Sequence, residues 1–271
     1  HILDNNGAGT NPSSKTVELL PFNSFTKNND ISMGTYGDEL IINAYTNEFK
    51  ASMATVPPKI EKNKKYTLVV TAKVQDPAAS QEVKLDFANK QSKEFNVTGE
   101  GYQKLELQFI TDDNPTGDNG KIRISIKNAY NSLIIKSVEI TDEGTAYSLD
   151  CNSFTKKGDM YMGSHGNEFI VSTIENEFKA GMATVPNMLE KNKRYTLVVT
   201  VRVQNPTAAQ GVKLDFANKQ SKEFNVTGGD YQKLELSFTT DDNPIGNNGT
   251  VNILLKNSNI PLIIKSIEIN E

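Results

Sequence analysis

The most regular pattern in the chain is an alternation of apolar and polar residues. Tyr66, Leu68, Val70, Ala72 and Val74 are separated by residues that are mostly polar or small. A strand with this pattern buries one face and leaves a mixed face outward. Similar runs predict further strands in the first half of the chain, at residues 39–43, 48–56, 83–87, 105–109, 122–126 and 133–140.

Turn-forming residues separate these runs, including Pro57-Pro58, Asp76-Pro77 and Asn119-Gly120. Proline presets the backbone angle of a turn and glycine permits positive φ, so these pairs predict tight connections. No segment sustains a period of 3.6 residues, and we therefore expect little helix. About eight strands in about 125 residues, with turns at this spacing, predict an all-β antiparallel sandwich of the jelly-roll kind.

The second half of the chain repeats the first. Residues 83–99 (VKLDFANKQSKEFNVTG) return unchanged at 212–228, and Asn23 matches Asn152 at an offset of 129 residues (152 − 23). Roughly two-thirds of the aligned positions are identical, and the period is that of a domain rather than of a solenoid repeat. We predict two tandem jelly-roll β-sandwiches, at 16–143 and 144–271, joined by a short connection at 141–145. A flexible N-terminal arm or linker at 1–15 precedes them.

Composition narrows the classes of partner. Basic and acidic residues number 29 and 33, for a net charge of −4, and both signs are well mixed along the chain. That balance argues against a nucleic-acid partner or an anionic membrane surface. The chain holds no apolar run of about 18 residues, so we expect no direct membrane insertion. We also identify no signal peptide, and a chain that begins with His1 resembles a piece of a longer protein.

Candidate catalytic groups are few. Cys151 is the single cysteine and aligns with Phe22, which favours a small buried hydrophobic residue over a reactive thiol. His165 aligns with Tyr36, so a histidine base would exist in one module only. We therefore expect no enzyme. Carboxylates that the fold brings together leave a glycosidase as an alternative.

One loop is a candidate cation site. Residues 112–120 (DDNPTGDNG) are dense in side-chain oxygens, and their counterpart at 241–249 replaces Asp118 by Asn247. Calcium takes six to eight oxygen ligands, which such a loop offers in part. Asp, Asn, Pro and Gly are also the residues that a wide hairpin turn requires, so a turn and a structural calcium are both open.

The repeated stretch supplies the first candidates for ligand binding. If Val83, Leu85 and Phe87 face the core, Asp86 points to the other face, and Asn89 and Gln91 follow it. Amide and carboxylate groups beside an aromatic ring are typical of sugar sites. Since the chain has no Trp, tyrosine has to supply the ring. The candidate ligand-binding residues are Tyr36, Asp86, Asn89, Gln91 and Tyr102, with His165, Asp215, Asn218, Gln220 and Tyr231 in the second copy; an ordinary solvated strand and turn is the alternative.

These residues also support a resemblance to known families. The segments at 23–25 (NSF), 65–70 (KYTLVV), 102–107 (YQKLEL) and 133–140 (LIIKSVEI) resemble jelly-roll carbohydrate-binding modules. The segments EKNKKYTLVV, VKLDFANK and DDNPTGDNG are similar in sequence to the C-terminal receptor-binding region of the vegetative insecticidal binary toxin B component, a relative of clostridial binary toxins. The resemblance covers nearly the whole chain. It implies a secreted protein and a structural calcium, although Thr26 and Lys136 stand where related modules carry acids.

The sequence thus predicts a non-catalytic tandem module that attaches a secreted toxin to a cell-surface glycan or glycoprotein. Two weak sites raise avidity by about 100-fold or more when both engage. The remainder of the parent toxin would be the second partner. Structural spacer modules of a larger secreted protein, and an accessory carbohydrate-binding module of a glycosidase, are the alternatives. Differences at Tyr36/His165, Tyr45/Ile174 and Tyr130/Asn259 suggest that the two copies differ in specificity.

Overall fold

The computed structural model describes residues 15–271, and its contacts divide the chain into two compact units at the 143/144 boundary. We call them module 1, up to Glu143, and module 2, Gly144–Glu271. The predicted arm at 1–15 lies outside the described residues except for Lys15. The fold is all-β, as predicted, and its helical segments among residues 15–271 are four 3-10 turns: η1 (Phe22–Ser24), η2 (Gly117–Gly120), η3 (Cys151–Ser153) and η4 (Gly246–Gly249).

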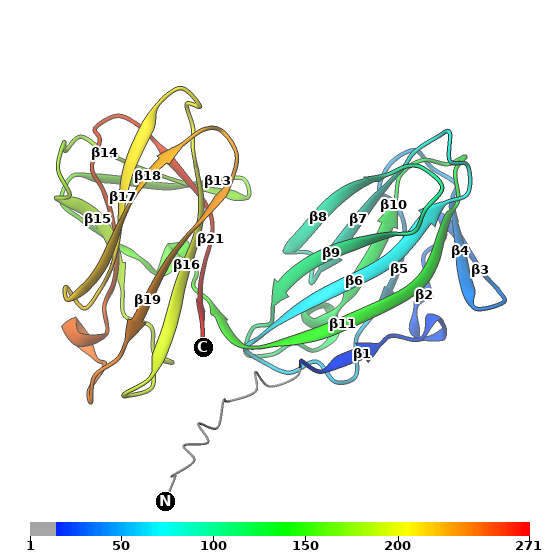
Figure 1. The fold of residues 1–271 in the computed structure, drawn as a ribbon, viewed down its shortest axis with the longest axis horizontal. Helices are drawn as coiled ribbons and strands as arrows, with labels where there is room; N and C mark the ends of the chain where they lie inside the picture. Colours follow the sequence, from blue (N-terminus) through cyan, green and yellow to red (C-terminus); the bar gives the residue numbers. More distant parts are fainter. Residues whose placement is uncertain (1–14) are drawn as a thin grey trace, which may run out of the picture. The chain divides into compact units, whose positions relative to one another are not determined.

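Module 1 consists of two sheets (Figure 1). The first, here called the front sheet, has the order β3 (Ile31–Tyr36), β4 (Glu39–Ala44), β11 (Leu133–Ser148), β6 (Lys64–Val74) and β9 (Gln103–Ile110), with β1 (Val17–Leu19) also paired to β11. The second, the back sheet, has the order β2 (Thr26–Lys27), β5 (Ala51–Thr55), β10 (Ile122–Ile126), β7 (Gln81–Phe87) and β8 (Gln91–Val97).

Module 2 repeats this topology. Its front sheet has the order β13 (Met160–His165), β14 (Glu168–Thr173), β21 (Leu262–Asn270), β16 (Arg194–Val203) and β19 (Gln232–Thr239), with the end of β11 paired to β21. Its back sheet has the order β12 (Thr155–Lys157), β15 (Ala180–Thr184), β20 (Val251–Leu255), β17 (Ala209–Phe216) and β18 (Gln220–Thr227).

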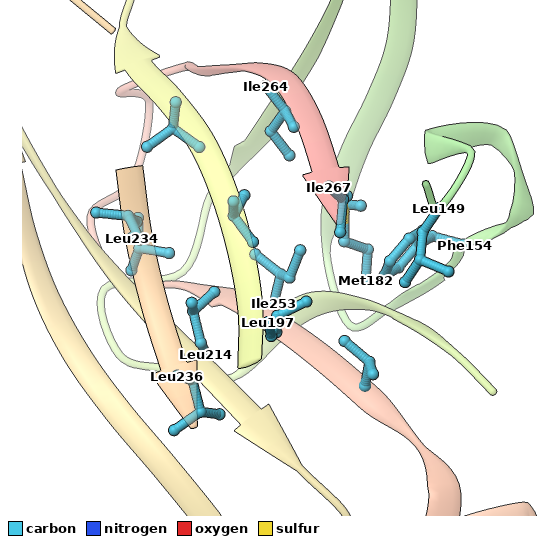
Figure 2. Close-up of a cluster of buried hydrophobic side chains, with 14 of the residues drawn as sticks. Leu149, Phe154, Met182, Leu197, Leu214, Leu234, Leu236, Ile253, Ile264 and Ile267 are labelled. Atoms are coloured by element: carbon cyan, nitrogen blue, oxygen red, sulfur yellow. The ribbon is translucent and has the colours of Figure 1, made fainter. Parts of the chain in front are cut away.

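The core of each module lies between its two sheets, because alternate residues of both point inward. Leu68 and Val70 of β6 face Leu85 of β7 within one buried cluster in module 1. In module 2, Leu197 of β16 and Leu214 of β17 belong to the equivalent cluster (Figure 2). Stacked rings close one side of each core: Phe87 and Phe109 lie 4.0 Å apart between centroids, as do Phe216 and Phe238.

The segment between the modules differs from the prediction. Residues 141–145 are not a separate connection but part of β11, which continues to Ser148. Ala146, Tyr147 and Ser148 pair with Asn270, Ile269 and Glu268 of β21. Val17, Glu18 and Leu19 pair in the same way with β11 in module 1. The connecting segment therefore leads directly into the first strand of module 2, residues 146–148. Backbone N–H and C=O groups that enter a sandwich need hydrogen-bond partners as much as those inside it.

Candidate functional site

The structure gives Asp86 and Asp215 a role inside the fold. Both carboxylates point away from the core strand face, as predicted, but they are only 7% and 5% exposed, which corrects the expectation of an accessible outer position. Asp86 Oδ2 accepts a hydrogen bond from the Asn89 backbone N–H at 3.0 Å, and Asp215 Oδ2 accepts one from Asn218 N at 2.9 Å. Residues 88–89 and 217–218 have positive φ, as in a type I′ turn. The two aspartates therefore fix the hairpin turns.

Gln91 and Gln220 also make internal contacts. Gln91 Nε2 donates to the Ile110 carbonyl at 2.8 Å, and its Oε1 accepts from the Ile110 N–H at 2.9 Å. Gln220 makes the same pair of bonds to Thr239. These amides tie the end of the back-sheet hairpin to the end of β9 or β19. Side chains that already satisfy two backbone groups are poor candidates for the first contacts with a ligand.

Asn89 completes this group at the β7–β8 turn. Its Oδ1 accepts a hydrogen bond of 2.6 Å from Arg123 Nη1 on β10. The equivalent of Arg123 in module 2 is Asn252, whose Nδ2 donates to Asp215 at 2.9 Å instead. The candidates from the repeated stretch thus lie together at the back-sheet hairpin of each module. The structure does not bring them to the candidate tyrosines.

Tyr102 is the centre of a polar cluster on the outer face of the front sheet in module 1. It immediately precedes β9, whose alternate leucines point into the core. Its hydroxyl donates to Glu39 Oε1 on β4. The Nζ atoms of Lys73 on β6 and Lys136 on β11 lie 4.7 Å and 5.3 Å from its ring centroid. Three strands and the residue just before a fourth thus contribute to one cluster, and two cations lie against the tyrosine ring.

Module 2 builds the same cluster around Tyr231. The Tyr231 hydroxyl donates to Glu168 Oε1 at 3.2 Å, and Arg202 Nη2 donates to the same oxygen at 3.1 Å. Arg202 Cζ and Lys265 Nζ each lie 5.3 Å from the Tyr231 ring centroid. The hydrogen bonds of Arg202 to Tyr231 and Glu168 raise the pKa of its guanidinium, so the cluster keeps this charge at every physiological pH.

Tyr36 and His165 stand at the edge of these clusters. Tyr36 pairs with Glu39 across the β3–β4 hairpin, and its ring is 69% exposed. His165 pairs with Glu168 in the same register. The front sheet therefore brings Tyr36 next to the Tyr102 cluster and His165 next to the Tyr231 cluster. Of the predicted residues, Tyr36 and Tyr102 form a candidate site in module 1, and His165 and Tyr231 form one in module 2.

Sequence reasoning missed one aromatic residue of this face, Tyr161. Its hydroxyl lies 3.4 Å from His165 Nε2. A Cβ atom at Gly163 would come within 2.9 Å of that hydroxyl, so the glycine leaves room for the tyrosine to lie along the strand. Tyr161, Gly163 and His165 share one strand face by their period of two, which is the signal that would have identified Tyr161. Ser32 occupies its place in module 1.

A shallow depression in module 2 adjoins Tyr161. It has a volume of about 280 Å³ and is lined in part by Ser172, Ile174 and Asn259. The Asn259 N–H donates to the Thr173 carbonyl at 2.8 Å, which holds that loop against the end of β14. Two of the positions at which the copies differ, Tyr45/Ile174 and Tyr130/Asn259, thus belong to this end of the module.

The candidate calcium loop is organised as a turn. Asp112 Oδ1 accepts from the Asn114 N–H at 2.9 Å, Asp113 Oδ1 accepts from Asn63 Nδ2 at 2.8 Å, and Asp118 forms an ion pair of 2.9 Å with Lys121. The three carboxylates have separate partners, whereas calcium needs its oxygens around one centre. Across residues 15–271 no group of three or more His, Cys, Asp or Glu side chains could hold a metal ion. In this structure the loop is therefore held by its own hydrogen bonds and one ion pair.

The thiol of Cys151 stays protonated and is therefore a poor nucleophile at neutral pH. It is partly buried, and this burial raises the pKa of the thiol to about 11. A thiol needs its deprotonated form to act as a nucleophile.

Between Lys15 and the end of the chain, no helix has the length and apolar character needed to cross a membrane.

The chain was compared with known proteins. No family model matches it, and no curated protein matches it either. Among solved structures, it is similar to the N-terminal CBM22-1–CBM22-2 tandem domain of Xyn10C from Paenibacillus barcinonensis, with 10% identity, 92% of this chain and 94% of that chain covered, and a TM-score of 0.36. It is also similar to the CBM22-1 xylan-binding domain of the same protein (11% identity, 46% and 91% covered, TM-score 0.34) and to a family 35 carbohydrate binding module from Clostridium thermocellum (14%, 47% and 98%, TM-score 0.35).

Proposed function

We propose that the chain is a pair of non-catalytic glycan-binding modules, each of which binds its ligand on the outer face of its front sheet. One observation carries the proposal. The duplication rebuilds the same cluster in both modules: a tyrosine that is hydrogen-bonded to a glutamate and has two cations near its ring, on a sheet face that projects an exposed ring or imidazole beside it.

The chemistry of this face suits a sugar. A pyranose offers an apolar face, which an aromatic ring contacts, and a rim of hydroxyls, which need both donors and acceptors. In module 1 the exposed Tyr36 supplies the ring, Glu39 accepts, and Lys73 donates. Because two lysines and Glu39 already contact Tyr102 before any ligand arrives, little further side-chain ordering is needed on binding.

For the parent protein, we propose that it is secreted and that these modules attach it to a carbohydrate-bearing surface. Two sites in one chain raise avidity when both engage the same surface. The sequence segments similar to the binary toxin B component favour a cell-surface glycan or glycoprotein as the receptor and a toxin as the parent protein. An accessory module of a glycosidase has the same binding chemistry. Since one of the similar structures is a xylan-binding domain, xylan is among the glycans to test.

Glycan-array screening of the full chain, with xylan in the panel, tests the proposal. Titration of the best ligand against Tyr36→Ala and Tyr102→Phe should show affinity reduced by about tenfold or more, because loss of a ring contact or of its fixed orientation removes on the order of 1–2 kcal/mol. Tyr130→Ala is the matched control in module 1, since Tyr130 is a 96% exposed tyrosine in the loop between β10 and β11 and not on a strand of the front sheet.

Three results would count against the proposal. Absence of saturable binding to any glycan would favour structural spacer modules. Unchanged affinity in both front-sheet variants, and again when they are combined with His165→Ala and Tyr231→Phe in module 2, would move the site elsewhere. Hydrolysis of a glycan that one Asp or Glu substitution abolishes would establish an enzyme instead.

A further inference from the structure

The back sheet of module 2 contains a hollow. Its volume is about 410 Å³, and its lining comes from four separate segments of the module. Two phenylalanines, one lysine, one glutamate, two asparagines and one glycine face it: Phe178, Gly211, Glu223, Phe224, Asn225, Lys256 and Asn257.

One substitution in the lining changes the charge beside the hollow. Gly211 on β17 aligns with Glu82 on β7. In module 1 the Glu82 carboxylate forms an ion pair with Lys127, with Oε2 3.2 Å from Nζ. In module 2 the stem of Lys256, the counterpart of Lys127, lies over the buried Gly211, and the carboxylate that would pair with its ammonium group is absent.

The surrounding backbone is held in the same place in both modules. Gln81 and Gln210 are fully buried. Gln81 Oε1 accepts from the N–H groups of Lys127 and Asn128 at 3.1 Å and 2.7 Å, and Gln210 Oε1 accepts from those of Lys256 and Asn257 at 3.2 Å and 2.7 Å. This corner cannot move inward without breaking those bonds, so the backbone that lines the hollow keeps its place.

The lysine also keeps its position over an aromatic ring. Lys127 Nζ lies 5.6 Å from the centroid of Phe49, and Lys256 Nζ lies 5.8 Å from that of Phe178. The ammonium group is therefore presented to the hollow in module 2 much as it is presented to Glu82 in module 1. In module 1 the corresponding lysine is paired with the Glu82 carboxylate, and the hollow of module 2 has no carboxylate at that position.

From this geometry we infer that module 2 has a second ligand subsite, which binds the carboxylate of an acidic sugar, a hexuronate, against Lys256. The sugar carboxylate takes the position that Glu82 occupies in module 1, its ring packs on Phe178, and the amides of Asn225 and Asn257 are available to its hydroxyls. The assignment to a sugar rests on the proposed function. Glu223 also faces the hollow and opposes the bound carboxylate, so it limits the affinity.

Two exchange variants of the full chain test the inference. Gly211→Glu rebuilds the pair of module 1. No left-handed φ is found at Gly211, and an added Cβ would lie 3.0 Å from Lys256 Cβ and 3.3 Å from Lys256 Cδ, so Lys256 has to shift by a few tenths of an ångström to admit the new side chain. Glu82→Gly removes the carboxylate opposite Lys127 in module 1. Thermal unfolding of both variants checks that the fold is intact.

The probes are methyl β-glucuronide and methyl β-glucoside, which share a ring and differ in the carboxylate, titrated at low salt and followed by NMR. We expect the wild-type chain to bind the glucuronide at least about tenfold more tightly than the glucoside. Gly211→Glu and Lys256→Met should each abolish this preference, Glu82→Gly should add a second site, and Glu223→Gln should tighten binding. Neutral-glycan binding at the front sheet should be unchanged in Gly211→Glu, which separates this subsite from the proposed function.

Equal affinity for both glycosides, or a preference that survives in Gly211→Glu, would overturn the subsite. Tighter binding of N-acetylglutamate amide than of the glucuronide would overturn the sugar assignment and identify an acidic side chain of a protein partner as the ligand. Glucuronide binding that persists when no neutral glycan binds would leave the subsite standing while the proposed function fails.

Discussion

Modules 1 and 2 share an interior framework but present different surfaces. The buried glutamines Gln81 and Gln210 make the same four hydrogen bonds in each copy. On the outer faces of the sheets, Glu82 becomes the buried Gly211, while Ser32 becomes Tyr161 and Tyr36 becomes His165. Interior changes such as Leu40 to Phe169 or Ile42 to Val171 keep apolar character. The outer faces of a rigid sandwich thus change without cost to the bonds that define the fold.

The largest effect is expected at the shared glutamines. Gln81→Met and Gln210→Met keep much of the shape but leave two backbone N–H groups and two carbonyls without these partners. Each should lower the free energy of unfolding of its own module by about 3 kcal/mol. Calorimetry with the exposed Gln108→Met as control checks it. A loss below about 1 kcal/mol in either module would contradict the framework we describe.

A second difference between the copies is Phe22 against Cys151. Since burial raises the pKa of the Cys151 thiol to about 11, the thiolate fraction below that pH is small and grows as pH rises. A thiol reagent at pH 8 should modify Cys151 about 100-fold more slowly than it modifies a free cysteine, whose pKa is about 8.5. Reactivity should rise to that of the free cysteine when the protein is unfolded in urea. Equal rates in the folded and unfolded chain would show that the thiol is accessible.

The smallest effect concerns the ion pair that one lysine of each module forms with an acidic residue near the end of that module. Lys64 Nζ lies 2.8 Å from Asp142 Oδ2, and Lys193 Nζ lies 2.7 Å from Glu271 Oε1. Hydrogen bonding, to Asp142 and to Glu271 respectively, raises the pKa of both ammonium groups, so their contribution to stability is complete at neutral pH and is lost only in strong alkali.

Lys64→Met should therefore lower the stability of module 1 by about 0.5 kcal/mol. The difference from the wild type should be constant between about pH 7 and pH 9, below the lysine pKa of about 10.4 in an unfolded chain. Lys193→Met should show a smaller change, because Lys193 is more exposed. Denaturant titrations at these pH values measure it, and a larger loss from Lys193→Met would reverse our ranking of the two modules.

Much of the fold was predictable from the sequence because the inner strands alternate strictly. The run from Tyr66 to Val74 forms β6, with every second side chain buried. Strand β8 escapes prediction because it is an edge strand, exposed along most of its length, and only Phe95 and Val97 at its end reach the core. The shared strand β11 is predicted as two elements because polar residues at 141–145 interrupt its apolar pattern.

The candidate site was only half predictable. Tyr36 and Tyr102 are identifiable as candidate rings, but Glu39, Lys73 and Lys136 lie on three different strands, and only the strand order shows that they meet at Tyr102. The burial of Asp86 and the bonds of Gln91 could not be predicted, because the sequence shows the chemistry of these side chains but not their internal partners. The change from Glu82 to Gly211 is visible in the alignment of the two copies, yet it acquires meaning only once Lys127 is found opposite.

The pairing of β1 with β11, and of the end of β11 with β21, has a consequence for how such a chain arises. Each module receives the chain on a strand that lies beside the strand from which the chain leaves. A gene segment coding for one module is thus delimited at a point where entry and exit are neighbours, and the exit strand of one copy serves directly as the entry strand of the next. Head-to-tail copying of this unit requires no newly evolved connector, which accounts for two copies that have diverged on their surfaces while their strand order is the same.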